Sequence, residues 1–198
     1  MNRITGLITG LMLLVMTPAF AEDAATQDVY KIDGAHSTIG FRIKHLGISF
    51  VNGKFDKFDG QLTFEGEKLV SIEGTVEANS INTANEKRDT HLKSDDFFGA
   101  EQFPTIKFKS TKVTQEGSKL GIVGELTIRD VTKIVEFQGE FGGLVYMENM
   151  KVHKAGVTLE GQINRQDFNL KFNKVLESGQ AIVGNDVMID LELEANRQ

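Results

Sequence analysis

Four histidines and the pair Arg88-Asp89 carry most of the chemistry that this 198-residue chain could perform. Imidazoles suit Zn or Cu, and His36, His45 and His91 could supply three ligands. Because their spacing matches no established zinc pattern, we expect no metal site. His45 and His91 could instead hydrogen-bond the polar end of a ligand, and the planar fork of Arg88 suits a phosphate or another anion. We therefore take His45, Arg88 and His91 as candidate head-group residues.

Each of these residues also has a purely structural interpretation. Arg88 with Asp95, or Asp89 with Lys93, has the spacing of an ion pair along one face of a helix, which contributes only a few tenths of a kcal/mol. The structural interpretation is favoured for Arg88. For His45, a ligand-binding role and a half-buried histidine bonded to backbone both stay open.

Catalytic motifs are absent from the sequence. There is no cysteine, no Gly-x-Ser-x-Gly, no phosphate-binding glycine loop and no His-Glu-x-x-His. Asp95 and Asp96 are adjacent and point apart, so they do not form an acid–base pair. We expect a protein that is not an enzyme and has no cofactor beyond a bound lipid. A net charge of −6 gives no electrostatic reason to bind nucleic acid.

Alternating apolar and polar residues run through most of the chain, which is typical of strands with one buried face. Ile39, Phe41 and Ile43 point one way, and Asn52-Gly53 and Asp59-Gly60 supply the turns that follow. The same alternation recurs over residues 72–78, 106–108, 120–128, 135–141, 157–163 and 187–193. The pattern predicts an all-β domain of eight or more strands, closed into an eight-stranded antiparallel barrel.

Two segments depart from this alternation. Residues 84–98 are charged and rich in helix formers, and they predict one helix that ends in a loop over residues 94–99. A second short helix is predicted over residues 173–178. The barrel is therefore expected to carry one or two short helices.

The first residues have the features of an export signal. A positive start at Arg3 precedes an apolar run over residues 7–16 and a small-x-small site, Ala19-Phe20-Ala21. The run is shorter than the ~20 residues of a membrane span. We expect a cleaved signal peptide over residues 1–21, a single domain over residues 22–198, and a periplasmic location.

A barrel interior either fills with side chains or holds one small ligand. Fourteen Phe, two Tyr and no Trp favour a dry interior, since Phe has no polar group, although ordinary core packing explains most of them. Glycines at inward positions, such as Gly124 and Gly161, either leave room or permit strand coiling. The residues predicted to line a ligand cavity share inward parity: Ile39, Phe41, Ile43, Phe64, Ile106, Phe108, Leu126, Phe137, Phe141 and Leu159.

Several motifs in order resemble those of the YceI-like family. They are His36-Ser37, Phe41, His45-Leu46-Gly47, residues 53–60 (GKFDKFDG), the block 85–108, residues 124–133 (GELTIRDVTK) and residues 163–168 (INRQDF). The resemblance implies a lipocalin-like extended barrel that binds polyisoprenoid lipids or other long-chain amphiphiles without catalysis, for transport, storage or scavenging.

Two other interpretations stay open at this point. An outer-membrane barrel would also alternate, but it needs girdles of Trp and Tyr that this composition lacks. A periplasmic enzyme could use His45 or His91 on an apolar substrate. The expected partner is a long-chain isoprenoid or fatty amphiphile, held by a protein that does not span the membrane. A homodimer is one assembly that the sequence allows.

Overall fold

The computed structural model describes residues 26–198, so the expected signal segment, residues 1–21, lies outside the described residues. The described chain is built mainly of strands, with one α-helix and two short 3-10 turns. The strands are β1 (Gln27–Ile32), β2 (Thr38–His45), β3 (Ser49–Phe55), β4 (Phe58–Glu65), β5 (Lys68–Glu77), β6 (Ile81–Asn82), β7 (Thr105–Glu116), β8 (Lys119–Ile128), β9 (Val131–Met147), β10 (Val152–Asn164) and β11 (Val183–Arg197). The helical elements are η1 (Ala78–Ser80), α1 (Glu86–Lys93) and η2 (Arg165–Phe168).

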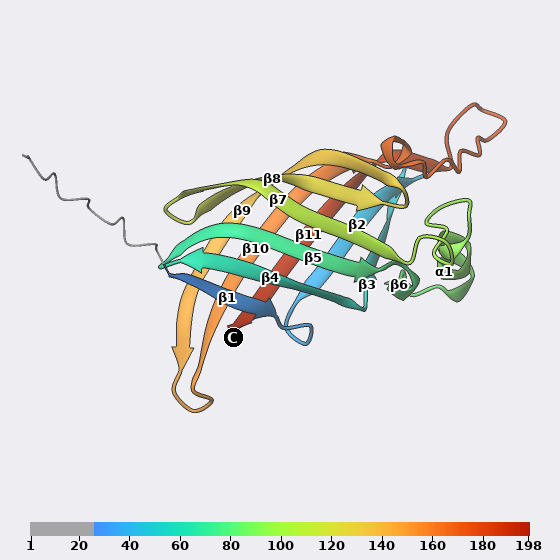
Figure 1. The fold of residues 1–198 in the computed structure, drawn as a ribbon. Helices are drawn as coiled ribbons and strands as arrows, with labels where there is room; N and C mark the ends of the chain where they lie inside the picture. Colours follow the sequence, from blue (N-terminus) through green and yellow to red (C-terminus); the bar gives the residue numbers. More distant parts are fainter. Residues whose placement is uncertain (1–25) are drawn as a thin grey trace, which may run out of the picture.

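All eleven strands belong to one antiparallel sheet that closes on itself (Figure 1). The last strand, β11, pairs with β2 along most of its length and with β1 at its end, where Ile32 lies opposite Ala195. Strands β1 and β2 therefore follow one another along β11 as one interrupted strand. Strands β3 and β4 follow one another in the same way along β2 and β1. With each of these two pairs counted as one strand, and with the two-residue β6 set aside, the sheet is the expected eight-stranded antiparallel barrel, which is confirmed.

The alternation in the sequence becomes alternation in burial. Along β8 the inward residues Leu120, Ile122, Gly124, Leu126 and Ile128 are all buried, while the residues that alternate with them are exposed or half-buried. Side chains of a strand point to opposite faces, so a register slip of one residue would turn this stripe to solvent. The stripe therefore fixes which face of β8 forms the barrel interior.

One half of the interior is packed solid. Tyr30 and Phe64 meet edge to face, with ring centroids 5.2 Å apart, and Phe141 lies 5.5 Å from Phe64. Leu62 and Leu159 are fully buried in the same apolar core. This half supplies the burial that holds the barrel together without a disulfide.

The opposite end carries the helix. Figure 1 shows α1 and the chain that precedes β11 at the same end of the barrel, away from the β9–β10 hairpin. Asn85 caps α1 by accepting a 3.0 Å hydrogen bond from the Arg88 amide. The predicted helix is confirmed, although it is shorter than residues 84–98, because the chain turns at Ser94. Within residues 26–198 no helix has the length and hydropathy needed to cross a bilayer.

The second predicted helix, over residues 173–178, is wrong. This segment forms a turn stabilised by an isolated bridge between Val175 and Ala181. The helix formers in this stretch have no apolar face to bury, and Gly179, which has a positive φ of 84°, favours reversal of the chain. The sequence predicted neither of the two 3-10 turns, η1 after β5 and η2 immediately after β10.

A polar cluster lies where β1, β2, β10 and β11 meet. The Asp33 carboxylate is 2.9 Å from Nδ1 of His36, and Lys154 Nζ lies 2.6 Å from Glu194 and 3.8 Å from Asp33. The hydrogen bond from His36, aided by the Ala35 amide, lowers the pKa of Asp33 from 3.8 to about 2. The ionised form of Asp33 therefore stabilises the turn between β1 and β2.

This cluster predicts an acid-dependent loss of stability. Because the folded pKa of Asp33 is depressed, its contribution is fully present above about pH 4 and is lost as the pH falls towards about 2. We expect about 1 kcal/mol for this partly exposed group. The free energies of unfolding of wild type and Asp33→Asn, measured with denaturant between these pH values, should converge as the pH falls. If the difference between them does not change with pH, the ionisation of Asp33 does not contribute to folding stability.

Candidate functional site

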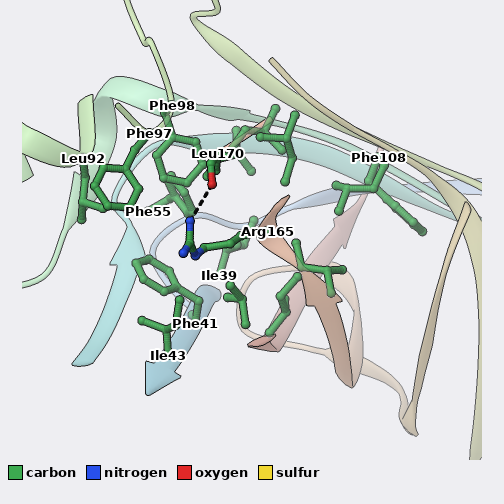
Figure 2. Close-up of a pocket in the computed structure, with 18 of the residues that line it drawn as sticks. Ile39, Phe41, Ile43, Phe55, Leu92, Phe97, Phe98, Phe108, Arg165 and Leu170 are labelled. Carbon is green, nitrogen blue, oxygen red and sulfur yellow. Dashed lines mark hydrogen bonds between the residues drawn. The ribbon is translucent and has the colours of Figure 1, made fainter. Parts of the chain in front are cut away.

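The half of the barrel next to α1 encloses a cavity of about 360 Å³. This volume lies in the lower part of the range of ~300–1,000 Å³ that is usual for small-molecule sites. Its walls come from inward residues of β2, β5, β7, β8, β9 and β11, and α1 and the chain from Leu170 to Val183 complete it. Figure 2 shows the aliphatic and aromatic side chains that dominate this lining.

Three phenylalanines of the wall each lie over a glycine of a neighbouring strand. A Cβ built on Gly53 would meet Cε1 of Phe41 at 2.7 Å, one on Gly124 would meet Cε2 of Phe108 at 2.6 Å, and one on Gly161 would meet Cδ1 of Phe137 at 2.5 Å. Each glycine thus leaves room for an aromatic ring of the neighbouring strand. This arrangement fits the first of the two roles considered for inward glycines, while strand coiling stays a prediction.

The predicted lining residues divide into two groups. Three of them, Phe64, Phe141 and Leu159, lie in or against the packed core and not at the cavity. The others are brought together around the cavity: Ile39, Phe41, Ile43, Ile106, Phe108, Leu126 and Phe137. Contact of these residues with a ligand stays a prediction.

Arg88 borders the cavity, but its guanidinium is engaged in a local network. Its Nε donates to the Thr83 hydroxyl at 2.7 Å and its Nη2 donates to the Thr83 carbonyl at 2.8 Å. The same hydroxyl donates to the Asp89 carboxylate, which also accepts from the Thr83 amide at 2.9 Å. Arg88 and Asp89 thus anchor the start of α1 to the chain after β6, and they do not form the helix-face pairs considered above.

His91 borders the cavity as part of an aromatic plug, by which we mean His91, Phe97 and Phe172. The three rings lie 4.9–5.1 Å apart, and the Phe172 amide donates to the Asp96 carbonyl. Nε2 of His91 also contacts the Asp96 carboxylate at 2.7 Å. The plug closes the end of the cavity between α1 and the chain after η2.

His45 lies at a different part of the border. It is half-buried at the end of β2, near Ile182 and Val183, where the lining reaches the surface. The candidate head-group residues thus surround one end of the cavity from two sides. Their assignment to a ligand head group stays a prediction.

The three histidines considered for a metal site are not brought together in residues 26–198. His36 lies instead with Asp33 and Glu194, whose ligand atoms come within 4.8 Å of one another. Lys154 already supplies a positive charge to both carboxylates of that cluster.

Arg165 is a buried, charged cavity residue that the sequence analysis missed. It is only 2% exposed and belongs to η2, and Figure 2 shows its guanidinium among the apolar side chains of the lining. It donates to the carbonyls of Leu170 at 2.5 Å and Gly184 at 2.8 Å, and to Oδ1 of Asn185 at 3.1 Å. Burial alone lowers the pKa of Arg165.

A signal for Arg165 was present in the sequence. The inward positions of β10 recur at every second residue (Val157, Leu159, Gly161 and Ile163), and Arg165 is the next in this series. An arginine that continues an inward apolar stripe is a buried charge, and buried charges are rarely left without a role.

The fold and the cavity together define a class of protein: closed antiparallel β-barrels that can hold a ligand in an apolar interior. The comparisons with known proteins place the chain within that class. A YceI-like domain matches residues 30–195, and the chain belongs to the YceI-like family.

Relatives of known sequence or structure agree with this assignment. A UPF0312 protein of Staphylococcus aureus strain N315 is 39% identical over 169 residues, which cover 83% of this chain and 95% of that protein. The Campylobacter jejuni YCEI protein is 31% identical over 78% of this chain and 90% of its own, with a TM-score of 0.68. A polyisoprenoid binding domain from Saccharophagus degradans shares the fold at a TM-score of 0.62 and 15% identity, covering 85% of this chain and 98% of that one.

The glycine–phenylalanine pairs generate a prediction about the cavity. In Gly53→Ala, the new methyl group would contact both the Phe41 ring and, at 2.8 Å, Thr83 Cγ2. Because Thr83 leaves the methyl group no room, the methyl group would displace the Phe41 ring into the cavity. We expect a loss of stability of about 1–3 kcal/mol. We also expect severalfold weaker binding of an apolar fluorescent dye, measured by titration.

Gly34→Ala is the matched control, since a Cβ there meets nothing within 4 Å. Adding Phe41→Leu to Gly53→Ala should restore dye binding by shortening the displaced side chain. Unchanged dye affinity in Gly53→Ala would show that the Phe41 ring does not shape the binding space.

Proposed function

We propose that this protein is a non-catalytic carrier or scavenger that holds the chain of a long apolar amphiphile, such as a polyisoprenoid, in the cavity beside α1. The observation that carries the proposal is the cavity of about 360 Å³ with its aliphatic and aromatic walls. The Saccharophagus degradans neighbour, which is described as polyisoprenoid binding, supports this choice of ligand class.

The burial of an apolar chain supplies the affinity in this proposal. Each buried methylene contributes about 0.8 kcal/mol, so about ten enclosed carbons give roughly 8 kcal/mol before the losses of ligand freedom are counted. Those losses cost several kcal/mol. Useful affinity therefore requires either more enclosed chain or a contribution from the polar end of the ligand.

The polar groups of the cavity also support binding over catalysis. Arg88 is bonded to Thr83, His91 to Asp96, and Arg165 to two backbone carbonyls. These contacts stabilise local structure. Even the Thr83 hydroxyl, which donates to the Asp89 carboxylate, also accepts from Arg88 Nε and is thus engaged at the start of α1. The proposal accordingly assigns no reaction and no cofactor, and its ligand is the lipid itself.

Export to a periplasm is part of the same proposal. It is supported by the positive start, the apolar run and the small-x-small site in residues 1–21. Intact-mass measurement of the protein from a periplasmic extract should show a chain that begins at Glu22. A protein recovered only from the cytoplasm with residues 1–21 attached would contradict export.

The ligand proposal predicts that the purified protein carries a lipid. Native mass spectrometry should detect added mass that organic extraction removes. Ile39→Trp, which fills the cavity from β2, should lose this mass. Thr38→Trp, at the neighbouring exposed position, should retain it. If neither wild type nor Thr38→Trp takes up any prenyl or acyl chain, the proposed function is wrong.

A further inference from the structure

Arg165 places a buried positive charge in a cavity whose walls are mainly apolar. Among residues 26–198, no carboxylate oxygen lies within 4.0 Å of its guanidinium nitrogens. Burial of a charge is costly unless an opposite charge or several hydrogen bonds compensate it. The charge of Arg165 therefore has hydrogen bonds but no counter-ion in the described protein.

The hydrogen bonds of Arg165 use only part of its capacity. A guanidinium carries five N–H groups in a fixed planar fork. Three of them are used by Leu170, Gly184 and Asn185, all through neutral oxygens. Two N–H groups remain on a side chain that borders the cavity.

Arg88, the other arginine of the cavity, is compensated differently. It donates to the Thr83 hydroxyl, which in turn donates to the Asp89 carboxylate. A negative charge thus lies within the Arg88 network. Arg165 is the cavity arginine whose hydrogen-bond network contains no negative charge in the described chain.

The position of Arg165 suits one end of an elongated ligand. Figure 2 shows it near Phe97, Phe98 and Leu170 at the plug end, with Phe108 farther along the lining. A polar group beside Arg165 leaves the rest of a ligand to follow the apolar wall towards Phe108 and the packed core. The polar end of the ligand then contacts Arg165, and its apolar chain contacts the apolar wall.

We propose that Arg165 receives an anionic, oxygen-bearing end group of the ligand, either a carboxylate or a phosphate. The two remaining N–H groups donate to its oxygens, and the anion supplies the missing counter-charge. This inference rests on the proposed function, because it names the chemical class of the amphiphile that the cavity holds.

Paired ligands that differ only in the end group test this inference. Oleate is compared with oleyl alcohol, and farnesyl phosphate with farnesol, by displacement of an apolar dye from the full-length protein. Wild type should bind the anionic member of at least one pair about tenfold more tightly. Arg165→Gln should abolish that preference while its affinity for the alcohol stays within about twofold. The pair that shows the preference identifies the source of the anion, fatty acid or prenyl phosphate.

Arg88→Gln tests the competing site, since Arg88 is a candidate head-group residue at the same cavity. It should keep the preference for the anion. Loss of the preference in Arg88→Gln but not in Arg165→Gln would place the head group at Arg88 and overturn the inference. Equal binding of acid and alcohol by wild type would overturn it as well, while leaving the proposed function intact. Failure of all four ligands to bind would overturn both.

If Arg165→Gln does not fold, a measurement on wild type alone still tests the inference. Bound oleate labelled with ¹³C at its carboxyl carbon is titrated by NMR. An adjacent arginine lowers a carboxyl pKa by about 1–3 units, whereas burial among apolar side chains without an opposite charge raises it, so the bound acid should titrate no higher than the free acid. A bound carboxyl that titrates well above the free acid would show that it does not contact Arg165.

Discussion

The constraint on which this structure depends is that a sheet with one apolar face must remove that face from water. Here the sheet does so by closing on itself, and β11 joins the two edges by pairing with both β1 and β2. Closure leaves a single interior volume, which side chains fill at one end only. The packed core around Phe64 therefore stabilises the barrel, and the other half is free to be hollow without loss of the fold.

The sequence predicted the fold well because its signal is local. Strand alternation, turn residues and the helix after β6 are each encoded within a few neighbouring positions. The site was predicted less completely, because parity gives the face of a strand but not the position along the barrel axis. Phe64 and Phe108 share inward parity, yet one lies in the packed core and the other at the cavity.

Arg88 and Arg165 show two further limits of sequence reasoning. The partner of Arg88 is Thr83, five residues earlier, and this pairing depends on how the chain enters α1. Arg165 continues the inward series of β10, but its meaning depends on the carbonyl of Gly184, which η2 and the turn before β11 bring close. Contacts of this kind come from tertiary structure, and no local pattern encodes them.

The aromatic plug differs from the walls in how it is held. The walls are continuous ladders of backbone hydrogen bonds, whereas the plug is joined by three ring contacts and by single bonds such as that from the Phe172 amide to the Asp96 carbonyl. Regions with few buried contacts open at a lower free energy than the global unfolding of the protein. We therefore expect the plug to open at a lower free energy than the barrel. A molecule enclosed behind His91, Phe97 and Phe172 would then leave at the rate of that local opening and not at the rate of global unfolding.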